Sequence, residues 1–87
     1  MKEEQYEQLE NEVLRGQRAQ RAYDEFIKEF VELKKVILFN NFCSIGVSET
    51  EKLQEARRLV TVIEDLEAHI ITIINTGKMA AKTLEGV

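Results

Sequence analysis

Three arginines, Arg15, Arg18 and Arg21, have the spacing in this sequence that is best suited to binding chemistry. On a helix, residues three apart are neighbours, so the guanidinium groups would follow one side and drift slowly around it. A guanidinium fork matches phosphate and carboxylate geometry. Tyr23 follows within a turn and Tyr6 lies upstream, and a tyrosine ring can stack on a base. The five residues form a candidate site for a phosphate-containing anion.

Ordinary ion pairing accounts for the same arginines equally well. Residues 1–14 contain five glutamates, and Asp24 and Glu25 follow the arginines. Salt bridges within one chain or between chains are the usual role of such charges on an exposed helix. The basic stretch is too short and too diluted by acid to favour binding to duplex DNA.

The remaining reactive residues give weaker signals. Asp65 and His69 are four residues apart and can meet on one helix face, where a surface hydrogen bond is the commoner outcome. Cys43 could act as a nucleophile with His69 only if the fold brings the two side chains together. A partly buried, inert thiol is the commoner role of a single cysteine. The acidic cluster Glu64, Asp65 and Glu67 is typical of a solvated face. No catalytic residue, metal ligand or cofactor is therefore predicted, and we do not expect an enzyme.

Composition narrows the class of protein further. The chain has 87 residues, a net charge of -4, one Cys and one His, which suits one domain over residues 1–87 without a disulfide or a structural zinc site. The N-terminus is acidic rather than signal-like, and no apolar stretch approaches the ~20 residues of a membrane span. We expect a cytoplasmic protein, in the host cytoplasm if a phage encodes it, that binds neither a membrane nor duplex DNA.

The first element that must position the arginines is a predicted helix over about residues 3–39. Its apolar residues recur at steps of three and four, which is typical of a helix packed on other helices. They are Tyr6, Leu9, Val13, Gly16, Ala19, Tyr23, Phe26, Phe30, Leu33 and Ile37. Gly16 costs about 1 kcal/mol relative to alanine. A kink, a break, the close approach of another backbone and one uninterrupted helix all stay open there.

A turn over residues 40–48 and a second helix over about 49–76 are predicted next. Asn40, Asn41 and Gly46 are turn residues, and Ser48 with Glu51 fits a capping box. The seam of the second helix steps by four and three. Its members are Leu59, Ile63, Leu66, Ile70, Ile73, Gly77, Ala80 and Leu84. Gly77 can end this helix, which would leave residues 77–87 as a short C-terminal helical segment, or it can sit inside one continuous helix.

The apolar face of the second helix is too broad for a single partner helix. A second line, Ala56, Val60, Ile71 and Ile74, lies beside the seam. A third helix or another copy of the chain must cover the excess width. The fold class is therefore all-α: a helical hairpin of two long helices, the first with a candidate kink near Gly16, and a short C-terminal helical segment, assembled as an oligomeric bundle. The expected oligomer interface consists of Phe26, Phe30, Leu33, Leu59, Ile63, Leu66, Ile70 and Ile73.

The hairpin and the pattern around Leu59 and Leu66-Glu67-Ala68 resemble the phage anti-CBASS cyclic-nucleotide sponges. Members of that family are small helical oligomers that sequester cyclic oligonucleotides between subunits. The Trp and the following basic residue of that family's last helix are missing here, so no binding residue is carried over.

The expected function is that of a small, non-enzymatic helical protein. It would act as a homo-oligomer and present helical surfaces to a protein partner. The alternative is a viral accessory protein that sequesters a small anionic nucleotide at its subunit interfaces.

Overall fold

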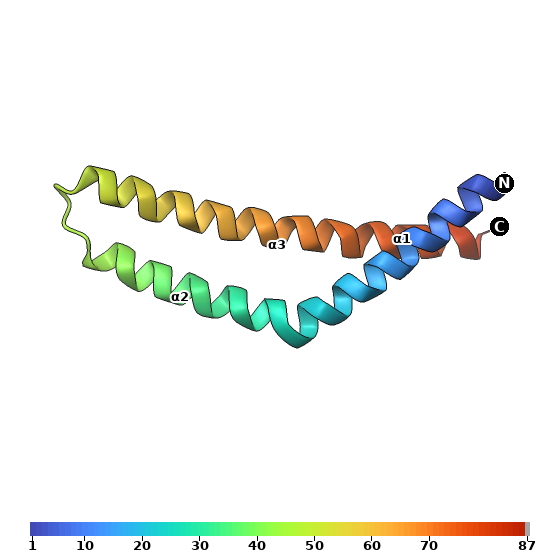
Figure 1. The fold of residues 1–87 in the computed structure, drawn as a ribbon, viewed down its shortest axis with the longest axis horizontal. Coiled ribbons are helices and arrows are strands. Elements are labelled where there is room, and N and C mark those ends of the chain that lie inside the picture. Colours follow the sequence, from blue (N-terminus) through green and yellow to red (C-terminus); the bar gives the residue numbers. More distant parts are fainter. Residues whose placement is uncertain (87) are drawn as a thin grey trace.

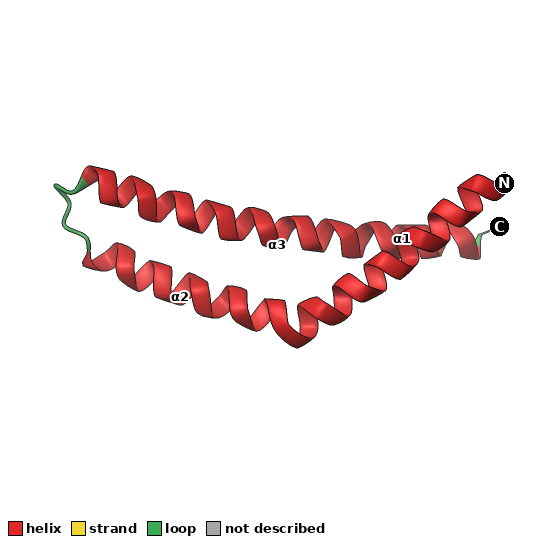
Figure 2. Cartoon of the chain, viewed as in Figure 1, coloured by secondary structure: helices red, strands yellow, loops and turns green. Residues whose placement is uncertain are grey.

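The chain folds into three α-helices and one π-helical segment over residues 1–86, the part that the computed structural model describes. Helix α1 spans Glu3–Ala22, the π-helical segment η1 spans Tyr23–Ile27, α2 spans Lys28–Ser44 and α3 spans Thr50–Glu85. α1, η1 and α2 follow one another without a loop and form one arm. The chain turns back at residues 45–49, so that α3 lies antiparallel to this arm (Figures 1 and 2). The predicted all-α hairpin is confirmed for these residues.

The bend in the first arm lies at η1, not at Gly16, where a kink was one of the alternatives left open. The N–H of Lys28 donates to the carbonyl of Tyr23, five residues back, so η1 holds one residue more per turn than an α-helix. Figure 1 shows the chain changing direction here, and α1 then crosses α3 near the two termini. Gly16 lies inside an unbroken α1.

This extra residue changes which side of α2 meets α3. The residues of the first arm that are buried or half-buried continue from Tyr23 through Ile27 and Val31 to Leu38. Phe26 and Leu33, which were expected in the seam, are 69% and 58% exposed. The predicted seam is therefore correct in α1 from Leu9 to Ala19, whereas Tyr6 is 44% exposed. In α2 it is shifted by one residue, because the π-helical turn rotates everything that follows it.

The turn between α2 and α3 differs from the predicted capping box. α2 continues to Ser44, and α3 begins at Thr50 after Glu49 rather than Ser48. Glu49 organises the turn: its carboxylate accepts from the Gly46 N–H at 3.0 Å and from Lys52 Nζ at 3.0 Å. The Lys52 bond and then the Gly46 bond lower the pKa of Glu49 below its ordinary value.

Helix α3 continues through Gly77 to Glu85, so the continuous helix is the correct alternative at Gly77, and a separate segment over 77–87 is wrong for its described residues. Gly77 has an ordinary helical backbone and lies in the contact face of α3. The whole helix of 36 residues is about 54 Å long at 1.5 Å per residue, which accounts for the 60 × 23 × 15 Å dimensions of the molecule. No helix within residues 1–86 has an apolar stretch long enough to cross a bilayer.

Candidate functional site

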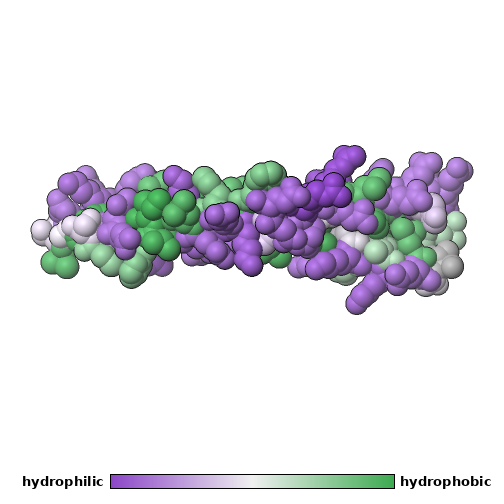
Figure 3. Space-filling view, turned by 90° about the horizontal axis from the view of Figure 1, so that it is seen from below, coloured by the Kyte–Doolittle hydropathy of each residue, from purple (hydrophilic) through white to green (hydrophobic). Residues whose placement is uncertain are grey.

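The most prominent surface feature is a line of large apolar side chains on each of the two antiparallel helices. We call them together the docking face. It consists of Phe26, Phe30, Leu33 and Ile37 on the η1–α2 arm and Leu59, Val62 and Leu66 on α3, all of which are exposed. Figure 3 shows hydrophobic residues gathered mainly over the α2 half of the molecule, whereas hydrophilic ones dominate over α1.

The two lines of the docking face lie on the same side of the hairpin. In α2, Phe30 and Ile37 each precede by one position a residue that packs toward α3, Val31 and Leu38. In α3, Leu59 and Leu66 likewise each come one position before a half-buried residue. Each exposed line therefore lies about 100° around its own helix axis from the residues that pack on the opposite helix, and the sense of this rotation is the same in both helices. In antiparallel helices, equal rotations in the same sense point to the same side.

The chain as a whole exposes more surface than a compact monomer. Its accessible surface is 6969 Å². A folded monomer of this mass exposes about 5,300 Å², which leaves an excess of roughly 1,700 Å². Among residues 1–86, few apolar side chains are buried: the larger Val31 and Ile74, and the smaller Ala56 and Ala80.

A second feature is the crossing of α1 and α3, where two glycine backbones touch. A Cβ atom added to Gly16 would lie 2.8 Å from the Gly77 Cα, and one added to Gly77 would lie 2.8 Å from the Gly16 Cα and 2.9 Å from the Glu12 carbonyl. Since real Cβ atoms do not approach backbone so closely, only glycine fits at either position. Of the alternatives left open at Gly16, the close approach of another backbone is confirmed.

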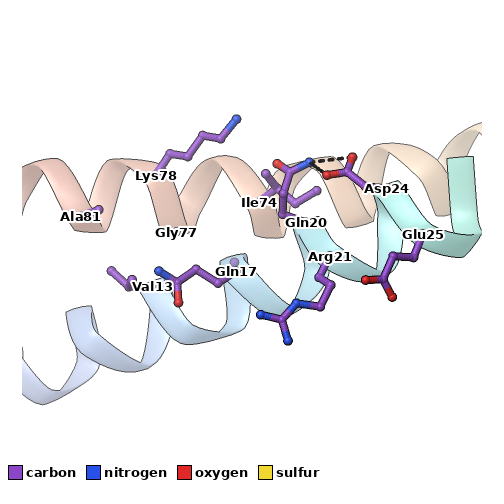
Figure 4. A pocket seen from close by; sticks show the side chains of 11 residues that line it. Val13, Gln17, Gln20, Arg21, Asp24, Glu25, Ile74, Gly77, Lys78 and Ala81 are labelled. Carbon is purple, nitrogen blue, oxygen red and sulfur yellow. Dashed lines mark hydrogen bonds between the residues drawn. The ribbon is translucent and has the colours of Figure 1, made fainter.

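A groove of about 480 Å³ runs beside this crossing. Its floor is apolar and consists of Val13, Gly16, Ile74, Gly77 and Ala81. Its remaining lining residues are polar or charged: Gln17, Gln20, Arg21, Asp24, Glu25 and Lys78 (Figure 4). We call it the crossing groove. Sequence periodicity did not predict it, because a groove depends on how far apart the two helices run on either side of their contact.

A polar cluster joins the first arm to α3 where the π-helical turn begins. The Tyr23 hydroxyl donates to one oxygen of Glu67 at 3.1 Å, and Lys35 Nζ donates to the other at 3.2 Å. Partial removal of water from the hydroxyl, and then the bond to the Glu67 carboxylate, raise the pKa of Tyr23. The cluster ties α2 to the middle of α3 and engages a tyrosine that was expected to face a ligand.

The five residues predicted to bind an anion are not brought together in one chain. Tyr6 and Tyr23 are 17 positions apart on continuous helix, which is about 25 Å. Arg15, Arg18 and Arg21 are exposed, and of these only Arg21 lines the crossing groove. No ion pair forms on any of the three arginines within residues 1–86, so the intrachain alternative does not account for them.

The other reactive residues are also dispersed. Cys43 is exposed near the end of α2, and His69 lies 19 residues into α3, so the two are roughly 25 Å apart along the hairpin. In the described part of the chain, no group of three His, Cys, Asp or Glu residues is placed to hold a metal ion. Of the acidic cluster, Glu67 serves the bridge to Tyr23 and Lys35, while Glu64 and Asp65 are exposed.

Comparisons with known protein families, with curated proteins and with solved structures found no match to this chain. The resemblance to cyclic-nucleotide sponges therefore stays an expectation from the sequence.

Proposed function

We propose that the chain is a non-enzymatic helical protein that associates with itself through the docking face and presents the helical surface of the assembly to a protein partner. The observation that carries this proposal is the exposure of seven large apolar side chains on one side of the α2 half. A monomer rarely leaves so many together, because each gains roughly 1.5–3 kcal/mol when it is fully buried.

A second copy of the same chain is the occupant that best fits this face. The elongated chain exposes roughly 1,700 Å² more than a compact monomer of its mass, and a standard interface takes about 800 Å² from each partner. Because both lines of the docking face lie on one side, two hairpins placed face to face form a four-helix arrangement that buries them in its centre. The residues expected at the oligomer interface that are not in the docking face, Ile63, Ile70 and Ile73, are half-buried along the same helix.

Sedimentation equilibrium tests the proposal. Phe30→Glu places a charge in the centre of the docking face, and we expect association at least a hundredfold weaker than in the wild type, since a buried unpaired charge costs several kcal/mol. Val47→Glu is the matched control, because Val47 is 93% exposed and lies in the turn outside the face. Equal association of Phe30→Glu and wild type would contradict the proposal.

The alternative, sequestration of a small phosphorylated ligand between subunits, is favoured by one observation. Arg15, Arg18 and Arg21 are exposed and form no ion pair within residues 1–86, so their guanidinium groups are available to an anion from outside the chain. Calorimetry with a panel of cyclic oligonucleotides tests it. Binding that Arg18→Glu abolishes while the oligomer persists supports sequestration, and the absence of heat with every member of the panel removes it.

A further inference from the structure

One side of α1 carries charges that are placed symmetrically about a single leucine. Leu14 is 50% exposed at the centre of this side. Two glutamates precede it by seven and four positions, Glu7 and Glu10, and two arginines follow it by four and seven, Arg18 and Arg21. Steps of three and four keep all five residues on one face of a helix, and all five are exposed. We call them the α1 stripe.

The α1 stripe faces away from α3. Gly16, whose backbone touches α3, lies two positions after Leu14 and therefore about 200° around the helix from it. Figure 4 shows the Arg21 side chain pointing away from α3. The docking face lies on η1, α2 and the N-terminal half of α3, so it shares no residue with the stripe. The whole stripe is therefore open to another molecule.

The charges of the stripe have no partner within one chain. Ion pairs along a helix join residues three or four apart, and at those distances the sequence offers no opposite charge to Glu7, Glu10 or Arg18. Arg21 has acids in range, but none of the four residues forms an ion pair within residues 1–86. Their neighbours along the stripe instead have like charge, which destabilises a helix. Opposite charges from outside the chain would relieve this repulsion.

We infer that α1 packs antiparallel on the α1 of a second copy, with a two-fold axis at Leu14. In this register Glu10 faces Arg18 of the other copy, Glu7 faces Arg21 of the other copy, and the two Leu14 side chains meet in the middle. The two-fold axis repeats both pairs, so one self-complementary surface forms four ion pairs. A parallel arrangement would place glutamate against glutamate and arginine against arginine, which is unfavourable.

The symmetry of the stripe favours a second copy over a different protein as the occupant. A partner of another sequence needs only a complementary surface, and nothing in such a contact requires acids and bases at equal distances from one residue. A two-fold contact between identical chains does require this placement, because residue i meets residue j of the other copy and residue j meets residue i.

This contact goes beyond the proposed function and does not depend on it, since it uses none of the docking-face residues. Exposed ion pairs each contribute little, so the contact between two α1 helices should be weaker than association through the docking face. Where both contacts form, each copy has two separate surfaces for other copies, which allows assemblies larger than a dimer.

Disulfide formation between two full-length chains tests the register. Leu14→Cys, combined with Cys43→Ser to remove the exposed native thiol, places two thiols together at the two-fold axis. Asn11→Cys in the same background is the matched control: Asn11 is also exposed on α1, but its two copies would lie about 9 Å apart along the helices. A disulfide needs Cβ atoms about 3.5–4.5 Å apart, so under mild oxidation Leu14→Cys should form the disulfide dimer roughly tenfold faster than Asn11→Cys.

Charge reversal tests the ion pairs. In the Leu14→Cys background, Arg18→Glu turns two attractive contacts into repulsive ones, and the disulfide dimer should form about tenfold more slowly. Adding Glu10→Arg restores opposite charges across the interface and should restore the rate. Arg15→Glu is the control, because it makes the same charge change near the thiol but lies about 100° around the helix from Leu14. It should change the rate far less than Arg18→Glu does.

Two results would overturn the inference. One is a rate in the Asn11→Cys control equal to that of Leu14→Cys. The other is the absence of recovery when Glu10→Arg is added to Arg18→Glu. Phe30→Glu, which weakens the docking face, should leave the ratio of the two thiol variants' rates unchanged. A failure of this inference is therefore distinguishable from a failure of association through the docking face.

Discussion

The two halves of α3 pack against the first arm in different ways. The C-terminal half meets α1 through small residues, so that the Gly16 and Gly77 backbones touch and Ala80 is buried. The N-terminal half meets α2 less closely and leaves Leu59 and Leu66 exposed. Both halves have the same three-four periodicity of apolar residues. The difference indicates that small residues let α1 and α3 pack directly on each other, whereas the larger residues of α2 and of the N-terminal half of α3 leave apolar side chains exposed.

The π-helical segment η1 lies between α1, which packs on the C-terminal half of α3, and α2, which packs on the N-terminal half. Its extra residue turns Phe26, Phe30 and Leu33 away from α3. The hydrogen bonds from Tyr23 and Lys35 to Glu67 hold the arm against α3 at this point. Bulges of this kind commonly occur at functional sites. Here the consequence is that the largest apolar side chains of α2 become surface.

The largest expected effect on stability distinguishes a residue inside the hairpin from a residue of the docking face. Val31 is 0% exposed, whereas Leu33, two residues on, is 58% exposed. Leu33→Ala should cost about 2–5 kcal/mol in the assembly that we propose, where a second copy would bury the side chain, and little after dilution to monomer. Val31→Ala should lower the melting temperature at every protein concentration. Melting curves over a hundredfold concentration range check both. A shift for Leu33→Ala that does not depend on concentration would count against the comparison.

The next effect concerns the crossing. Gly77→Ala places a Cβ against two backbone atoms that cannot rotate away, so α1 and α3 must separate. We expect a net loss of about 1–3 kcal/mol in unfolding free energy, although alanine alone would favour the helix by about 1 kcal/mol. Gly86→Ala is the control, since its Cβ would lie 3.7 Å from its nearest neighbour. Chemical denaturation of both variants measures the difference. An unfolding free energy of Gly77→Ala equal to that of the wild type would mean that the Gly16 and Gly77 backbones are not in contact.

A smaller effect is expected at the junction between the halves. The folded state raises the pKa of Tyr23, so its contribution to stability is fully present below the ordinary value near 10 and is lost as the pH rises through the raised value. Tyr23→Phe should be less stable than the wild type at neutral pH and should lose less stability above pH 10.0. Urea denaturation at the two pH values checks this. Parallel losses in both proteins would exclude Tyr23 as the titrating group.

The smallest effect lies in the turn. Because the folded state lowers the pKa of Glu49, its contribution to stability is present above the unfolded value of 4.5 and is lost as the pH falls through the folded value. Glu49→Gln should therefore be slightly less stable at pH 7 and equal to the wild type at low pH. Glu51→Gln is the comparison variant, because Glu51 lies two residues further on, in the first turn of α3, and has no such bonds. A constant difference at all pH values would contradict this role for Glu49.

Periodicity was sufficient to predict the all-α hairpin and the place of Gly16 in its contact face. It did not predict η1, because Phe26, Phe30 and Leu33 form as good an apolar line as Ile27, Val31 and Leu38. Only packing against α3 chooses between them. The capping box failed for a similar reason: Glu49 can reach both Gly46 and Lys52, and this bonding moves the start of α3 by a residue. The crossing groove depends on the separation of two helices, which no local pattern encodes.

The molar mass of the wild-type chain in solution tests the central claim most directly. Light scattering at micromolar concentration should give a multiple of the 10.1 kDa chain mass, since the docking face is then covered by a second copy. A mass of 10.1 kDa across the micromolar range would contradict self-association and leave the exposed apolar side chains of α2 without the occupant proposed for them.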